Sequence, residues 1–177
     1  RIIESAADSE YMAKKVKDTN GCYVVPAFTG LGAPHWNTGA RGMIIGITAA
    51  TSKEQITRAA LESMAYQTRD LLEEMERNSG IKLKELKVDG GASKNDFLMQ
   101  FQADILNCRV VRPKDIETTA LGACYLAGLG CGIFKSEDEI KELWEADRVF
   151  EPQMDEETRE NLYAQWCKAV EKSKDWL

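Results

Sequence analysis

The chain alternates between short runs of β-branched residues and longer stretches in which apolar residues recur at helical spacing. The best-defined helix is expected to begin at the capping box Thr51-Ser52-Lys53-Glu54 and to end at Asn78-Ser79-Gly80. Its apolar residues are expected to form one buried stripe, made of Ile56, Ala60, Met64, Leu71 and Met75. The pattern therefore predicts a long amphipathic helix in the first half of the chain.

The segments before this helix are shorter. Asp8 or Ser9 is expected to cap a short helix that Asn20-Gly21 closes. Residues 22–28 predict a strand, with Pro26 near its end because proline cannot donate to a ladder. Residues 29–42, with four glycines and no periodicity, predict a long ordered loop, and residues 43–48 predict a short buried strand.

After the long helix, the hydrophobic period switches repeatedly between strand and helix. Residues 83–88 and 108–111 predict strands, and residues 95–106 and 118–129 predict helices. The second of these helices is rich in Ala and Gly, which would let it lie close on a sheet. Further helices are expected from Ser136 and from Asp155. Because the crossovers are long enough to hold helices, the chain predicts one α/β domain with some parallel pairing.

Composition and charge argue against several classes of function: nucleic-acid binding, membrane spanning and thiolate metal binding. The chain has 177 residues, a formal charge of −6 and a pI near 5.0. This balance argues against a nucleic-acid partner, because a polyanion needs a basic surface. No apolar run reaches the roughly 18 residues of a membrane span. The five cysteines are widely spaced, which indicates a reducing cytoplasm, and we expect them to be small buried hydrophobic residues rather than metal ligands.

The most informative segment is the double glycine of Val88-Asp89-Gly90-Gly91, between a predicted strand and a predicted helix. Glycine allows positive φ and close approach of a ligand, and the free amides of the following helix would face that ligand. Asn95, expected one residue inside the helix, has an amide that donates and accepts, which suits a ribose or a base edge. Nucleotide binding is one interpretation, and a turn shaped for steric reasons alone is the other.

Other segments offer weaker candidates. The sequence holds neither a P-loop nor a G-x-S-x-G nucleophile elbow. His35 has no carboxylate or hydroxyl partner nearby in sequence, so we expect a loop contact with Trp36 rather than a catalytic triad. Arg41 and Arg112 could pair with phosphate, although a surface or interface role is the simpler interpretation.

Several segments share a resemblance to one known family. They are residues 23–36 followed by Ala40-Arg41-Gly42, residues 42–47 with residues 55–56 and 59–62, residues 65–70, residues 88–106 and residues 118–123. In this order they resemble the FGGY family of carbohydrate kinases, and within it the C-terminal domain of the glycerol kinases, and the second of these groups fits the second signature pattern of that family. The likeness extends from about Ser9 to Trp176, and His35 departs from it because the family usually has Tyr there.

The resemblance implies an α/β fold of the ribonuclease-H-like, actin-like ATPase type, truncated on its N-terminal side. Residues 1–177 would form the C-terminal, nucleotide-binding domain of a two-domain kinase. Such kinases transfer the γ-phosphoryl group of ATP to glycerol. By the same resemblance Gly90, Gly91 and Asn95 bind the nucleotide, and no catalytic or metal-binding residue lies in this chain.

The cofactors implied are ATP and Mg²⁺, the latter held mainly by the ATP phosphates and by the half that precedes Arg1. The implied partners are glycerol, the missing N-terminal domain and further copies of the full enzyme, in the cytoplasm. Two alternatives stay open. One is a related kinase that acts on another polyol or a pentulose, and the other is a non-catalytic nucleotide-binding or interaction module.

Overall fold

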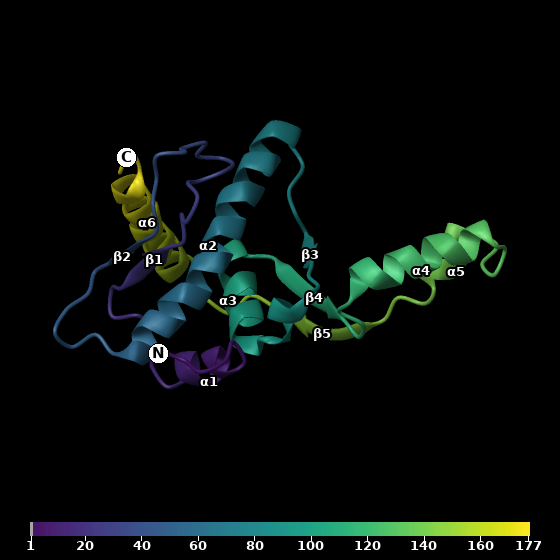
Figure 1. The fold of residues 1–177 in the computed structure, drawn as a ribbon, viewed down its shortest axis with the longest axis horizontal. Helices are drawn as coiled ribbons and strands as arrows, with labels where there is room; N and C mark the ends of the chain where they lie inside the picture. Colours follow the sequence, from purple (N-terminus) through teal and green to yellow (C-terminus); the bar gives the residue numbers. More distant parts are fainter. Residues whose placement is uncertain (1) are drawn as a thin grey trace.

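A long helix, α2 (Lys53–Ser79), runs through the centre of the computed structural model, which describes residues 2–177 (Figure 1). Its capping box lies one residue later than predicted. The Gln55 amide donates to Ser52 Oγ at 3.3 Å, and the Ser52 amide donates to Gln55 Oε1 at 2.9 Å. The predicted end is confirmed, because Gly80 closes the helix with a φ of 69°.

The face of α2 that is buried differs from the predicted stripe. Met64, Leu71 and Met75 are exposed by 45%, 43% and 56%. The helix packs against α1 (Asp8–Lys14), β1 (Tyr23–Val25) and α3 (Asp96–Leu106) through a different set of residues. That buried set is Thr57, Ala59, Leu61, Glu62, Ser63, Ala65, Tyr66, Arg69 and Asp70.

The buried carboxylates of Glu62 and Asp70 are tolerated because they find partners, whereas the buried Tyr66 hydroxyl and Arg69 Nη1 have none among the described residues. Arg58 Nε donates to Glu62 Oε1 at 2.7 Å. Asp70 accepts from Tyr163 Oη at 2.6 Å and from Trp166 Nε1 at 2.9 Å. Hydrogen-bonded polar groups therefore occupy core positions that hydrophobic periodicity assigned to solvent.

The N-terminal elements are α1 (Asp8–Lys14), β1 (Tyr23–Val25) and β2 (Met43–Ile45). The predicted side-chain cap of α1 is wrong, because Ala7 holds the cap position without a side-chain bond. The closing turn is confirmed, since Asn20 and Gly21 have φ of 52° and 75°. β1 and β2 pair antiparallel, and β2 is half-exposed rather than buried. Residues 29–42 form the predicted loop.

The second sheet has the order β3-β4-β5, made of β3 (Glu85–Lys87), β4 (Arg109–Pro113) and β5 (Ala146–Phe150). β3 and β4 are parallel, joined by the short 3₁₀ helix η1 (Gly91–Lys94) and by α3 (Asp96–Leu106). This crossover confirms the predicted parallel pairing. The antiparallel strand β5 was not predicted from the sequence.

The core lies where α2, α3 and α6 (Glu156–Ser173) meet. Asp155 caps α6 by accepting from the Thr158 amide at 2.8 Å. The ring of Trp166 is fully buried and stacks on Tyr66 at 5.3 Å, while Phe101 meets Tyr66 edge-on at 5.5 Å. These aromatic contacts fix α3, and with it the turn that precedes α3, against the central helix.

Helices α4 (Thr118–Gly130) and α5 (Glu137–Lys141) extend away from the other elements (Figure 1). The prediction that α4 lies on a sheet is wrong within residues 2–177, since Gly128 is the only buried residue of α4. Gly128 instead leaves room for the ring of Phe134, which would lie 2.6 Å from an added Cβ. The Leu126 side chain is 72% exposed.

Two further sequence expectations can be compared with the structure. Cys22 and Cys108 are buried as expected, but the other cysteines, Cys124, Cys131 and Cys167, are exposed. In the part of the chain that the structure describes, none of the helices is long and apolar enough to cross a membrane.

Candidate functional site

A cavity of about 520 Å³ lies between α1, α2 and the turn that leads into α3. Two of the three predicted site residues, Gly91 and Asn95, line it, whereas Gly90 does not. The remaining lining residues are Ala6, Ala7, Ser9, Glu10, Leu61, Met64, Ala92, Lys94 and Leu98. Mostly apolar walls with a few polar groups, in a volume of this size, are typical of a small-molecule site.

Glycine is favoured at positions 90 and 91 for two different structural reasons. Gly90 has φ 76° and ψ 174°, a conformation that side chains rarely adopt, so the backbone itself requires glycine there. Gly91 has no positive φ, and a Cβ built on it would meet nothing within 4 Å. The missing side chain of Gly91 therefore keeps space open at the cavity.

Asn95 is the N-cap of α3 rather than a residue inside the helix. Its Oδ1 accepts from the Leu98 amide at 2.9 Å, and its Nδ2 donates to Ser9 Oγ at 3.3 Å. The Asp96 amide donates to Glu10 Oε2 at 3.2 Å. Two amides that the sequence suggested were free are thus engaged, and Nδ2 of Asn95 keeps one N–H for a ligand.

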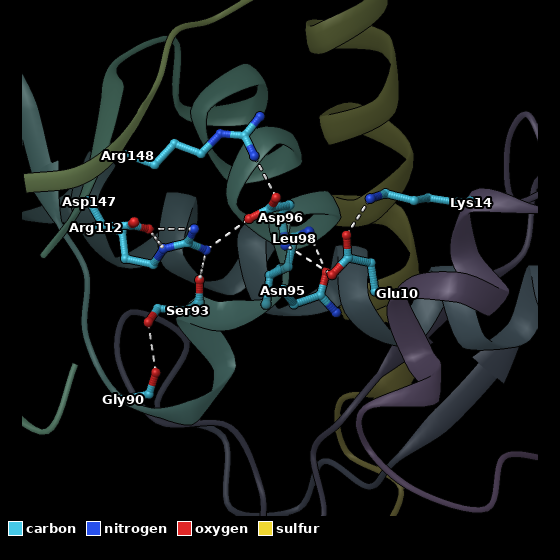
Figure 2. Close-up of polar contacts among 10 residues, drawn as sticks. All are labelled: Glu10, Lys14, Gly90, Ser93, Asn95, Asp96, Leu98, Arg112, Asp147 and Arg148. Carbon is cyan, nitrogen blue, oxygen red and sulfur yellow. Dashed lines mark hydrogen bonds and ion pairs between the residues drawn. The ribbon is translucent and has the colours of Figure 1, made fainter. Parts of the chain in front are cut away.

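Charged groups of β4 and β5 hold the turn on the side away from Glu10 (Figure 2). Arg112 Nη1 donates to the Ser93 carbonyl and to Asp96 Oδ1, both at 2.8 Å. Arg112 Nη2 contacts Asp147 at 2.7 Å, and Arg148 Nη1 donates to the other Asp96 oxygen at 2.5 Å. Arg112 is therefore committed within the protein and is not the phosphate partner that the sequence allowed.

The start of the turn is attached to the segment before α4. The Gly90 amide donates to the Ile116 carbonyl at 2.8 Å, and Thr118 Oγ1 donates to the Asp89 carboxylate. Ser93, which is buried, donates its hydroxyl back to the Gly90 carbonyl at 2.7 Å. The backbone beside the cavity is consequently held at both ends.

Sequence reasoning missed the residues that complete the cavity. Ser9 and Glu10 come from α1, more than eighty positions before Asn95, and no local pattern links them to the turn. Met64 was assigned to a buried stripe, but it lines the cavity. Lys94 lies within the glycine turn, and the adjacent Asn95 was the only signal that could have found it.

The other sequence candidates lie elsewhere. His35 Nε2 lies 3.1 Å from Asp70 Oδ2, while Trp36 is 78% exposed, so the expected contact of His35 with Trp36 is replaced by one with a distant carboxylate. Arg41 Nη1 donates to the carbonyls of Thr38 and Ala40, which leaves phosphate binding without support there. Neither residue lines the cavity.

The residues that line the cavity are suited to binding a small molecule. Glu10, the carboxylate of the cavity wall, pairs with Lys14 and accepts from the Asp96 amide (Figure 2). Across residues 2–177 there is no group of three His, Cys, Asp or Glu side chains placed to hold a metal ion. A planar apolar group against Leu61, Met64 and Leu98, with a polar group at Asn95, fits this lining.

Known proteins resemble the whole chain. A glycerol kinase of Pseudothermotoga lettingae is 63% identical over all 177 residues, which are 36% of its own length. A glycerol kinase of Pseudomonas fluorescens is 58% identical over 99% of this chain and 35% of its own length. The chain therefore spans about a third of the length of the curated relatives it matches.

Solved structures match the fold. The glycerol kinase of Plasmodium falciparum with ADP gives a TM-score of 0.87 at 38% identity, over 97% of this chain and 34% of its own. Ligand-bound xylulose kinase from Lactobacillus acidophilus gives 0.80 at 27% identity, over 96% and 35%. The predicted fold class, the ribonuclease-H-like α/β fold of actin-like ATPases, is confirmed by these neighbours.

The segments that carried the resemblance also fall inside a family match. Residues 2–131 match the FGGY family of carbohydrate kinases, C-terminal domain, and this range contains the cavity, its double-glycine turn and Asn95. More than half of the chain is covered by that match, and the relatives agree with it over nearly the full length. This chain belongs to the FGGY family of carbohydrate kinases, as a C-terminal domain of that family.

Proposed function

We propose that residues 1–177 are the C-terminal, nucleotide-binding domain of a glycerol kinase, which transfers the γ-phosphoryl group of ATP to glycerol and gives sn-glycerol 3-phosphate. The observation that carries the proposal is the difference in identity among relatives. The two curated glycerol kinases named above are 63% and 58% identical to this chain and that of Plasmodium falciparum is 38% identical, whereas the gluconate and xylulose kinases of Lactobacillus acidophilus are 27% identical. The chain spans about 35% of those relatives, so the rest of the kinase is expected to precede it.

The cavity beside the glycine turn is the proposed nucleotide site. Its apolar walls suit the adenine ring, and the free N–H of Asn95 Nδ2 suits a ribose or base acceptor. Gly91 leaves room for the nucleotide at the backbone, and Gly90 gives the turn its shape. A neighbour of the same fold is a glycerol kinase solved with ADP, which supports a nucleotide in this family.

The reaction itself needs groups outside this chain. A glycerol hydroxyl oxygen attacks the γ-phosphorus, the bond from that phosphorus to the bridging oxygen breaks, ADP leaves, and the hydroxyl proton passes to a base. Glu10 pairs with Lys14 and accepts from the Asp96 amide, so we do not expect it to be that base. We expect the base to lie in the preceding part of the kinase, and we expect 177 residues alone to bind ATP weakly and to be inactive.

Mg²⁺ is expected to arrive with the ATP phosphates and to be held by the preceding part of the kinase. The described residues of this chain, 2–177, offer no cluster of three metal-binding side chains, so no step is assigned to a metal here. The five free thiols support a reducing, cytoplasmic location. Assembly of the full enzyme into homo-oligomers stays a prediction.

A second candidate is a family member that phosphorylates a pentulose or another polyol. It is favoured by the TM-score of 0.80 to a ligand-bound xylulose kinase. A third is a non-catalytic module, for which the exposed α4 offers a contact surface. The polyol is chosen in the part of the kinase that precedes this chain, so activity measurements separate these candidates.

The test uses the intact kinase that carries this chain, supplied with ATP and with glycerol, xylulose or gluconate. ADP release is measured by a coupled assay, and a variant with Gly91→Val serves as the control for the nucleotide site. We expect glycerol to give the highest kcat/KM and Gly91→Val to raise the KM for ATP. Preference for xylulose or gluconate would replace glycerol as the substrate, and release of ADP with none of them would support the non-catalytic module.

A further inference from the structure

Arg112 is the most heavily bonded side chain behind the glycine turn (Figure 2). Its guanidinium is 13% exposed and uses all three nitrogens. Nη1 donates to the Ser93 carbonyl and to Asp96 Oδ1 at 2.8 Å, while Nε and Nη2 contact Asp147 Oδ2 at 2.8 and 2.7 Å. One side chain of β4 thereby joins the turn, the first residue of α3 and β5.

We propose that Arg112 is a positioning residue for the nucleotide, because it fixes the Ser93 carbonyl and the start of α3 and so sets where Gly91 and Asn95 meet the cavity. This inference rests on the proposed function, since it presumes that a nucleotide occupies that cavity. Arg112 itself does not line the cavity and touches no substrate.

The turn needs such support because the bonds within it are local: Ser93 donates its amide and hydroxyl to the Gly90 carbonyl, and the Asn95 amide donates to the Ala92 carbonyl. It is a four-residue 3₁₀ helix that begins after Gly90, and short 3₁₀ segments have poor hydrogen-bond geometry. Gly91 and Ala92 are exposed, whereas Ser93 is only 1% exposed. The Ser93 carbonyl is therefore the group of the turn that can accept a hydrogen bond from the protein interior.

The geometry requires arginine. The planar fork of a guanidinium presents donors in several fixed directions, whereas a lysine ammonium is a single point charge on a flexible stem. At position 112 a lysine could keep one of the three acceptors but not the Ser93 carbonyl, Asp96 and Asp147 together. Arg112→Lys therefore preserves the positive charge but loses the simultaneous contacts with Ser93, Asp96 and Asp147.

Arg109 provides a matched control on the same strand. Its Nε pairs with Glu85 at 3.0 Å across β3 and β4, and it has no contact with the turn among the described residues. A lysine at 109 tests what the loss of a guanidinium from β4 does to the sheet in general. Asp147→Asn is an intermediate case, because it weakens the outer hold on Arg112 but leaves Arg112 beside Ser93.

The experiment compares the intact kinase with its Arg112→Lys, Arg109→Lys and Asp147→Asn variants. The dissociation constant of ADP is measured by isothermal titration calorimetry, and steady-state kinetics give kcat and the KM for ATP and for glycerol. For Arg112→Lys we expect about tenfold weaker ADP binding and a similar rise in the KM for ATP, with kcat and the KM for glycerol within about twofold of wild type. Arg109→Lys should stay within about twofold throughout, and Asp147→Asn should fall between the two.

The possible results distinguish failure of this inference from failure of the proposed function. ADP binding by Arg112→Lys equal to wild type would do so and would leave the proposed function intact. If kcat and the melting temperature both fell and the KM values for ATP and for glycerol both rose, Arg112 would have a structural role only. A wild-type enzyme that binds ADP but leaves glycerol untouched would refute the glycerol assignment alone, whereas failure of the wild type to bind ADP would refute both proposals.

Discussion

Asn95 has two separable tasks in this structure, and two substitutions divide them. Its Oδ1 caps α3 through the Leu98 amide, and its Nδ2 offers an N–H at the cavity. Serine is as good an N-cap as asparagine but has no carboxamide nitrogen, whereas alanine has neither group. Asn95→Ser should therefore keep the cap and lose the contacts of Nδ2 with the ligand and with Ser9, whereas Asn95→Ala should lose the cap as well.

The expected magnitudes differ for the two measurements. Loss of the cap costs about 1 kcal/mol, which lowers the melting temperature by roughly 2–4 °C in a chain of about 150–250 residues and by less in the longer intact kinase. Loss of one neutral hydrogen bond to the nucleotide costs about 0.5–1.5 kcal/mol, or roughly a two- to twelvefold rise in the KM for ATP. Only Asn95→Ala should melt earlier, while both variants should show the same rise in KM.

The assay is steady-state kinetics in the intact kinase, combined with thermal unfolding followed by circular dichroism. Both variants also lose the 3.3 Å contact of Asn95 with Ser9, so Ser9→Ala controls for that contact. A KM for ATP that rises in Asn95→Ala but not in Asn95→Ser would show that helix stability is responsible rather than the amide. An unchanged KM in both variants would refute the role of Asn95 in nucleotide binding.

Two further predictions concern backbone conformation and pH. Gly91→Ala should raise the KM for ATP without lowering stability, because the added Cβ meets no protein atom within 4 Å. Gly90→Ala should lose about 1–3 kcal/mol of unfolding free energy, measured in urea, because the φ of Gly90 is 76°. Equal stability of the two variants would contradict this difference. Burial raises the pKa of Glu62 to about 7, so the folded chain keeps a proton that the unfolded chain releases near pH 4. The stabilisation that this proton gives is complete below that pH and is lost as pH rises through 7, a loss of about 3 kcal/mol in all. Urea unfolding of wild type and of Glu62→Gln at pH 4 and pH 8 should show this loss in the wild type alone. A difference in stability between the two proteins that does not depend on pH would refute the prediction.

Features set by local backbone chemistry were predictable from the sequence. Gly80 ends α2, Asn20 and Gly21 take positive φ, and the double glycine separates a strand from a helix. In each case the residue type is nearly sufficient, because few residues tolerate those conformations. The same chemistry identified the turn beside the cavity and the helix after it.

Features set by contacts between distant segments were not predictable. The buried face of α2 depends on Tyr163 and Trp166, about ninety residues later, which make Asp70 acceptable in the core. His35 finds the same carboxylate, although nothing near it in sequence offered a partner. The Ala- and Gly-rich pattern of α4 indicated a packed helix, but no strand among residues 2–177 covers it.

The cavity combines residues that a local motif identified with residues that only contacts between distant segments bring together. Gly91 and Asn95 could be selected because they belong to one local motif, whereas Ser9 and Glu10 enter only when α1 folds against α3. Asn95 was placed inside the helix by the sequence and is its cap in the structure, since the preceding 3₁₀ turn delays the start of α3. That shift commits its oxygen to the helix and leaves only its nitrogen for a ligand.

The most direct measurement is a crystal structure of the intact kinase with ADP. We expect the adenosine to occupy the 520 Å³ cavity, with its base against Met64 and Leu98, an acceptor within hydrogen-bond distance of Asn95 Nδ2, and Gly91 in backbone contact. ADP bound elsewhere, with this cavity empty, would contradict the nucleotide site proposed for the double-glycine turn.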